Sequence, residues 1–218
     1  MKQYEENGIL SRYYEHTSLS NRQRAVLRAS LVLFAKKGYE NTSTKEIAEM
    51  AGVAEGTVYK RFKTKRVILE TLLAPLENEI IPEVAEQFIG DLAARPETSL
   101  ADLLSYAVAD RLSYAMHNRA ALRILLQEIS KDPTLLQRLT VRLRSVFDGR
   151  VDKLFASYQS RGELLPWPPM RIIRCVTGIM LGYVLPNLLM AETPLDVESV
   201  TQQVVAAILH GVSPQPNA

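Results

Sequence analysis

The stretch that most constrains the fold is IAEMAGVAEGTVYKRF, residues 47–62, in which a glycine interrupts a helical pattern. Residues 47–51 follow helical spacing, and a second short helical pattern then runs to Phe62. Gly52 stands between them, where a tight corner needs a positive φ that glycine adopts without strain. Two short helices joined by such a corner predict a helix-turn-helix, a motif that can place its second helix in a DNA major groove.

The second helix of this pair has an apolar side and a polar side. Val58 and Phe62 form the apolar side, which we expect to pack on Ile47, Val53 and the preceding helix. The residues left for solvent, or for a major groove, are Thr57, Tyr59, Lys60 and Arg61.

Capping signals place the helices on the N-terminal side of this corner. Ser20 precedes an apolar face that repeats at helical spacing, and Gly38 is suited to end that helix. Ser43 and Glu46 form a capping box, so a second helix is predicted from about Thr44 to Ala51.

The net charge of +2 conceals an uneven distribution along the chain. Residues 20–66 carry +7, residues 1–19 carry −1 and residues 67–218 carry −4. A compact basic segment joined to a mildly acidic remainder favours binding of a polyanion by the basic part. A basic face that is only solvated is the alternative.

The run RAVLRASLVLFAKKGYENTSTKEIAEMAGVAEGTVYKRFKTKRVILETLL, residues 24–73, resembles the N-terminal domain of the tetracycline-repressor (TetR) family of transcriptional regulators. The matching pieces are Phe34-Ala35, Gly38-Tyr39, Thr42-Ser43, Ile47-Ala48, Ala51-Gly52-Val53, Gly56-Thr57-Val58-Tyr59, Phe62 and Lys65. The match covers about fifty residues; residues 74–218 resemble the family only in being helical.

The resemblance implies which residues meet DNA. Contacts to the phosphate backbone are implied for Thr44, Thr57, Tyr59 and Lys65, while Lys45, Lys60 and Glu55 fall where base edges are read. Gly56 is expected to allow close backbone approach, and Arg61 to add a phosphate contact. Two residues depart from the family pattern: Ala54 replaces a frequent capping serine, and Arg61 replaces a frequent histidine or tyrosine.

The remaining chain predicts helices and no strands, so the expected fold is all-α with about nine helices. We expect a flexible arm over residues 1–19, a DNA-binding domain over 20–66 and a helical ligand-binding and dimerisation domain over 67–218. Pro75 and Pro82 predict kinks or breaks, and one long helix is expected over residues 133–161.

The resemblance also implies a cavity for a small-molecule inducer among the middle helices. Aromatic, sulfur-bearing or polar residues within apolar faces are the candidate walls, although each is also a candidate for ordinary core: Phe88, Tyr106, Tyr114, Met116, His117, Phe147, Phe155 and Tyr183. The expected function is a repressor that an inducer releases from a palindromic operator. A DNA-binding architectural or protein-partnered factor without an inducer is the alternative.

The last two helices are expected to form a homodimer, as the resemblance implies, because a monomer reads only half a palindrome. Gly178 and Gly182 lie one turn apart and offer a flat strip to another helix.

Residues 175–191 carry no charge and approach the length of a membrane span, but Pro186 and Asn187 interrupt the run and favour a buried helix.

The sequence favours neither an enzyme nor a secreted protein. His16, His117 and His210 are far apart and in no metal-ligand spacing, and no nucleotide-binding or nucleophile motif is present, so neither a metal nor a cofactor is expected. No signal-peptide pattern opens the sequence, and a single cysteine, Cys175, fits a reducing cytoplasm.

Overall fold

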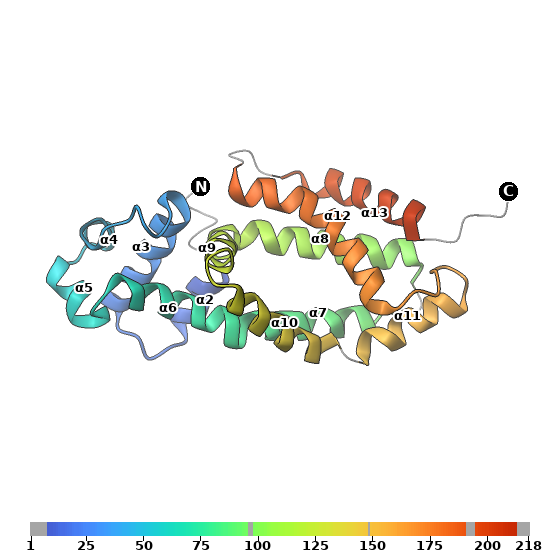
Figure 1. Ribbon diagram of the computed structural model, residues 1–218, viewed down its shortest axis with the longest axis horizontal. Coiled ribbons are helices and arrows are strands. Elements are labelled where there is room, and N and C mark those ends of the chain that lie inside the picture. Colours follow the sequence, from blue (N-terminus) through green and yellow to red (C-terminus); the bar gives the residue numbers. More distant parts are fainter. Residues whose placement is uncertain (1–7, 96–97, 148, 191–194, 213–218) are drawn as a thin grey trace. The chain divides into compact units, whose positions relative to one another are not determined.

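The computed structural model describes residues 8–95, 98–147, 149–190 and 195–212, and Figure 1 shows their arrangement into helices. Within these ranges the secondary structure is helical and contains no strand, which confirms the predicted all-α fold. The chain divides into two compact units, one formed by Met1–Ile81 with His117–Thr140 and the other by Pro82–Met116 with Val141–Ala218.

The first unit is built around α3 (Asn21–Lys37), which contacts α2, α4, α5, α6 and α9. Their bounds are α2 Ile9–Glu15, α4 Thr44–Ala51, α5 Glu55–Phe62, α6 Lys65–Pro75 and α9 Arg119–Ile129. Leu27, Phe34, Ile47 and Ile68 are fully buried at these contacts. Burial of such apolar surface is the main favourable term in folding, so α4 and α5 rest on a continuous core.

Residues 9–15, predicted as part of a flexible arm, instead form helix α2. Leu10 and Tyr14 are 1% and 2% exposed, and the Tyr14 hydroxyl donates a hydrogen bond to the carbonyl of Thr71 at 2.9 Å. The prediction failed here because two helical turns are too short to show a sustained apolar period; α2 is ordered by tertiary contacts. Residues 1–7 of the predicted arm lie outside the described residues.

Pro75 and Pro82 give a wide turn instead of a break. Between them, α6 passes into the π-helix η1 (Leu76–Ile80), followed directly by α7 (Ile81–Ala93). The Ile81 N–H donates to the carbonyl of Leu76, five residues earlier, as a π-turn requires. The ring of a proline within a helix clashes with the carbonyl four residues earlier, and proline has no N–H to donate to that carbonyl. One extra residue in the turn relieves this clash while the helix continues.

The second unit comprises most of α7 and α8 (Leu100–His117), the end of α10 (Pro133–Phe147), α11 (Arg150–Ser160), α12 (Pro169–Leu189) and α13 (Val197–Val212). Helix α12 contacts both α11 and α13, and α12 and α13 lie side by side in Figure 1. The expected single helix over 133–161 is divided between α10 and α11. Gly149, with φ +75°, adopts a left-handed conformation that a helix interior does not accommodate.

One helix among the described residues, Pro169–Leu189 (α12), is long and apolar enough to cross a membrane by length and composition alone. Only 22% of its most apolar window is buried within a single chain. Much of this helix is therefore only partly covered by the described residues of its own chain.

Candidate nucleic-acid interface

The corner between α4 and α5 has the geometry that the sequence predicted. Gly52 has φ +66° and ψ +34°, which is the left-handed conformation, and it ends α4. Its N–H donates to the carbonyl of Glu49 at 3.2 Å, and the N–H of Val53 donates to that of Ala48 at 3.0 Å. These bonds satisfy carbonyls at the end of α4 and turn the chain sharply into α5.

Helix α4 begins at the predicted capping box. The Glu46 N–H donates to Ser43 Oγ at 3.2 Å, and Glu46 Oε2 accepts from the Ser43 N–H at 2.9 Å. The other carboxylate oxygen of Glu46 accepts from Lys37 at the end of α3. The bond from Lys37, followed by those from Ser43, lowers the pKa of Glu46 to about 2.

Helix α5 begins without a side-chain cap, as Ala54 predicts, and presents its polar side outward. Val58 and Phe62 are 1% and 4% exposed, whereas Tyr59 is 49% exposed. Lys60 and Arg61 are also exposed, in the last turn of the helix. The buried side holds α5 on the core, so its cationic side is free to meet a phosphate-rich surface.

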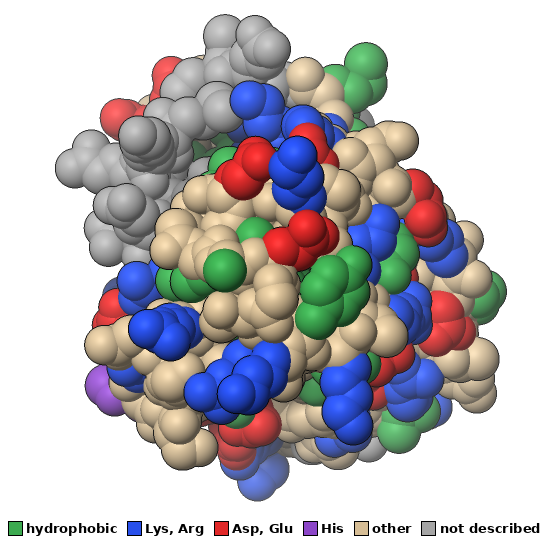
Figure 2. Space-filling model, turned by 90° about the vertical axis from the view of Figure 1, so that its left-hand side faces the viewer, with side chains coloured by type: hydrophobic (Ala, Val, Ile, Leu, Met, Phe, Trp, Pro, Cys, Tyr) green, Lys and Arg blue, Asp and Glu red, His purple; other side chains and the backbone are tan. Residues whose placement is uncertain are grey.

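Figure 2 shows the face of the molecule that carries α4 and α5, where lysine and arginine side chains, with some acidic ones among them, lie around a few exposed hydrophobic ones. Lys45, Glu55 and Gly56 are exposed, while Thr44, Thr57 and Lys65 are half-buried. Sequence reasoning missed two further exposed residues, Met50 in α4, at 51%, and Lys63 directly after α5. Exposure at one position in a helix leaves no periodic signal by which Met50 could have been found.

Hydrogen bonds join the start of α4 to α5. Thr44 Oγ1 donates to Glu55 Oε1 at 3.0 Å and lies 2.9 Å from the Tyr59 hydroxyl. Because the threonine hydroxyl has one hydrogen, which goes to Glu55 in this arrangement, Tyr59 is the donor to Thr44. The Tyr59 hydroxyl must therefore leave Thr44 before it can donate to a phosphate.

Lys65, predicted to neutralise a phosphate, has close partners within its own chain. Its ammonium donates to the carbonyls of Tyr39, Glu40 and Thr42 at 2.8, 3.3 and 2.9 Å, and lies 4.3 Å from the centre of the Tyr39 ring. These bonds tie the first turn of α6 to the segment that precedes α4. The phosphate contact stays a prediction, to which the structure adds a role in holding this segment.

The residues predicted to line an inducer cavity are distributed over several helices. Phe88 lies on α7, Phe147 on α10, Phe155 on α11 and Tyr183 on α12, and α8 carries the other four, Tyr106, Tyr114, Met116 and His117. His117 is exposed and belongs to the first unit; the other seven are half-buried and belong to the second.

Arginine side chains cover several of these aromatic rings. The Arg111 guanidinium lies 4.1 Å from the ring centre of Phe88 and 5.1 Å from that of Tyr114, and it forms an ion pair with Asp110. Arg95 lies 4.0 Å from the ring centre of Tyr106. These rings are engaged in cation–π contacts, so their assignment to a ligand cavity remains a prediction.

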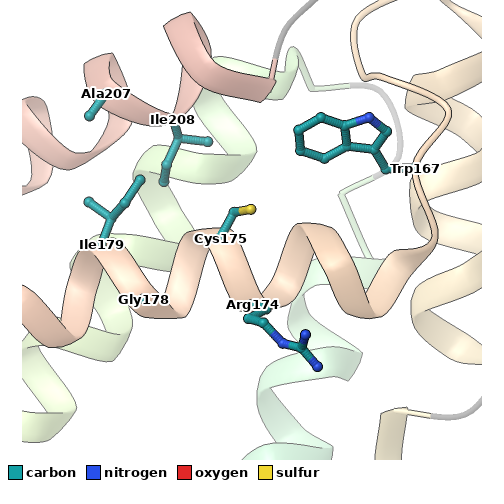
Figure 3. Close-up of a pocket in the computed structure, with 7 residues that line it drawn as sticks. All are labelled: Trp167, Arg174, Cys175, Gly178, Ile179, Ala207 and Ile208. Atoms are coloured by element: carbon teal, nitrogen blue, oxygen red, sulfur yellow. The ribbon is translucent and has the colours of Figure 1, made fainter.

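A hollow of about 360 Å³ lies elsewhere in the second unit, between α12, α13 and the segment before α12. It is lined by Trp167, Arg174, Cys175, Gly178, Ile179, Ala207 and Ile208, and by none of the eight predicted wall residues. In Figure 3 the Cys175, Ile179 and Ile208 side chains point into the space, while Arg174 points away from it. The lining is therefore mostly apolar, and its polar groups are the Arg174 guanidinium and the Trp167 indole N–H.

The described residues contain no group of three or more His, Cys, Asp or Glu side chains placed to hold a metal ion.

Comparison with known protein families shows where similar helix pairs occur. Residues 26–72, which include α4, the glycine corner and α5, match the family described as bacterial regulatory proteins, tetR family. The N-terminal part of the chain therefore matches the TetR family.

Relatives of this chain are similar either over about a third of its length or over most of it. The HTH-type regulator YvkB of Bacillus subtilis is 42% identical over 69 residues, which are 32% of this chain and 36% of YvkB. The HTH-type transcriptional repressor KstR2 of Mycolicibacterium smegmatis is 26% identical over 199 residues, 89% of this chain and 92% of KstR2.

The solved structure of NalD from Pseudomonas aeruginosa, described as the secondary repressor of the MexAB-OprM multidrug efflux pump, has the same fold with a TM-score of 0.56. It is 25% identical, and the alignment covers 88% of this chain and 96% of NalD. The likeness thus extends beyond the helix pair to the helices that follow it.

Proposed function

We propose that this chain is a cytoplasmic transcriptional repressor of the TetR family that binds a palindromic operator as a homodimer and is released by a small molecule. The observation that carries the DNA-binding part is the geometry of α5, whose buried Val58 and Phe62 fix the helix while Tyr59, Lys60 and Arg61 face outward. A short, exposed, cationic helix after a tight corner suits insertion in a major groove. No enzymatic role is proposed.

The dimer is proposed from the uncovered surface of α12. Met170, Leu181 and Leu189 on this helix are 54%, 46% and 43% exposed. Large apolar side chains gathered on one helix favour association with a partner. A two-fold dimer built on α12 and α13 presents two copies of α5, as the two halves of a palindrome require.

Repression is proposed by analogy with two relatives, and release by a small molecule is proposed from the resemblance to the TetR family. KstR2 and NalD are both described as repressors. A ligand weakens DNA binding only by its difference in affinity between the DNA-binding and released conformations. An architectural factor without an inducer remains the second reading, and it predicts DNA affinity that no small molecule changes.

Selection of bound duplexes from a random pool tests the proposal with the full-length protein. The expected result is an inverted repeat, bound with an affinity that falls steeply as salt is raised, because cationic contacts release counterions. A scrambled duplex of the same length and composition is the control. Equal affinity for both duplexes at physiological salt would contradict sequence-specific regulation.

A further inference from the structure

A buried carboxylate lies in the first unit, apart from the residues predicted to meet DNA. Glu128, in the last turn of α9, is 5% exposed. Its Oε1 lies 3.2 Å from Lys131 Nζ, and its Oε2 lies 3.4 Å from Arg66 Nη1. Burial of a carboxylate is unfavourable unless it is paired, so Glu128 depends on these two cations.

The two cations connect Glu128 to the segments at the two ends of the helix pair α4–α5. Arg66 is the second residue of α6, directly after the short turn that follows α5. Lys131 Nζ lies 3.5 Å from Glu40 Oε1, in the segment between α3 and α4, and 5.7 Å from the centre of the Tyr39 ring. One buried side chain therefore connects to the chain just before α4 and just after α5.

Lys65 closes this arrangement. Through its bonds to the carbonyls of Tyr39, Glu40 and Thr42, the start of α6 is also joined directly to the segment before α4. The connection runs from Glu40 through Lys131, Glu128 and Arg66 to Lys65 and back to residues 39–42. We call Glu40, Arg66, Glu128 and Lys131 the Glu128 cluster.

We infer that Glu128 is a positioning residue for DNA reading. It sits on α9, which packs against α3, and it holds both anchors of the helix pair through the Glu128 cluster. The orientation in which α5 meets the groove then depends on a side chain more than sixty residues away in sequence. This inference rests on the proposed function, because positioning matters only if α5 reads DNA.

The chain offers a matched control at Glu70. Its Oε1 lies 2.9 Å from Arg66 Nε, but it is four residues along the same helix, with a side chain 58% exposed. Glu70→Gln removes an acidic partner of Arg66 without touching α9. Glu128→Gln keeps the shape of the side chain and removes the anion that Arg66 and Lys131 share, so that each cation keeps only its exposed acidic partner, Glu70 or Glu40.

Two measurements on the full-length variants test the inference. Hydrogen exchange without DNA should show amides of residues 39–66 exchanging severalfold faster in Glu128→Gln, with the second unit unchanged. Affinity for the duplex selected by the native protein should fall about tenfold with an unchanged salt slope, because no phosphate contact is removed. Glu70→Gln should change neither measurement by more than about twofold, as for a surface pair.

Lys131→Met provides a second variant if Glu128→Gln fails to fold, because the Lys131 side chain is 48% exposed. It should change exchange and affinity in the same direction as Glu128→Gln. Unchanged exchange over residues 39–66 in both variants, or equal acceleration in both units, would overturn the inference. If the native protein selects no duplex, the proposed function fails, while the exchange data still report on how the helix pair is held.

Discussion

Tyr59 and Lys60 are neighbours on α5, but only the side chain of Tyr59 is hydrogen-bonded within the chain. The Tyr59 hydroxyl lies 2.9 Å from Thr44 Oγ1, whereas the side chain of Lys60 has no hydrogen bond or ion pair within the described residues. Lys60 can therefore donate to a guanine edge at no internal cost. Tyr59 suits the phosphate backbone, which carries no sequence information directly.

Alanine at these two positions should separate the roles. Lys60→Ala should lose about 1–3 kcal/mol of discrimination between the selected operator and a single-base variant. Tyr59→Ala should weaken binding to both duplexes by the same factor, about tenfold or less. Parallel titrations of the two duplexes measure this, and a specificity loss in Tyr59→Ala alone would contradict the assignment.

Gly56 allows fold stability and DNA binding to be tested against each other. It lies inside α5 with ordinary helical φ, and a methyl group there would meet nothing within 4 Å. Gly56→Ala should therefore raise the free energy of unfolding by about 0.5–1 kcal/mol. If the DNA backbone approaches this surface closely, operator affinity should fall at the same time.

Thermal unfolding and operator titration of Gly56→Ala provide the two readings. The control is Gly52→Ala, where φ is +66° and a side chain is strained, so that this variant should lose about 1–2 kcal/mol of stability. Unchanged operator affinity in Gly56→Ala would show that DNA does not come close to this residue.

At the scale of the helix, the stability of the junction between α3 and α4 should depend on pH. Glu46 has a pKa of about 2 in the folded chain against an ordinary value of 4.5, mainly because Lys37 and Ser43 donate hydrogen bonds to it. A lowered pKa means that its contribution to stability is complete above pH 4.5 and is lost as the pH falls toward 2.

Denaturation of the native protein and of Glu46→Gln across this pH range measures the contribution. The difference in free energy of unfolding between them should shrink as the pH falls from 4.5 toward 2. Glu49→Gln changes an exposed side chain of the same helix outside the capping box and should give no such trend. A constant difference for Glu46→Gln would contradict the assigned cause.

At the scale of the whole molecule, the apolar surface of α12 predicts the dimer. Leu181→Glu places a charge among the uncovered side chains of this helix and should shift the protein toward monomer in sedimentation velocity. Operator affinity should fall steeply with it, since each monomer reads one half-site. Leu136→Glu, at a leucine 51% exposed on α10, is the matched control and should stay dimeric.

The local features of the helix pair α4–α5 were predictable from sequence because each is decided by neighbouring residues. The Gly52 corner, the Ser43–Glu46 box, the missing cap at Ala54 and the buried Val58 and Phe62 depend on spacings of a few residues. The division at Gly149 was missed because a lone glycine inside an apolar period is compatible with a continuing helix.

The amino-acid sequence by itself determined the helical class, the corner and the cationic side of α5, because periodicity, caps and a left-handed glycine are local properties. The tertiary structure alone decided that α2 is a helix, that Lys65 holds residues 39–42, and that Glu128 joins α9 to Arg66 and Lys131. These depend on which distant residues share one buried volume. A carboxylate such as Glu128 is stable there only once folding has brought its partners to it.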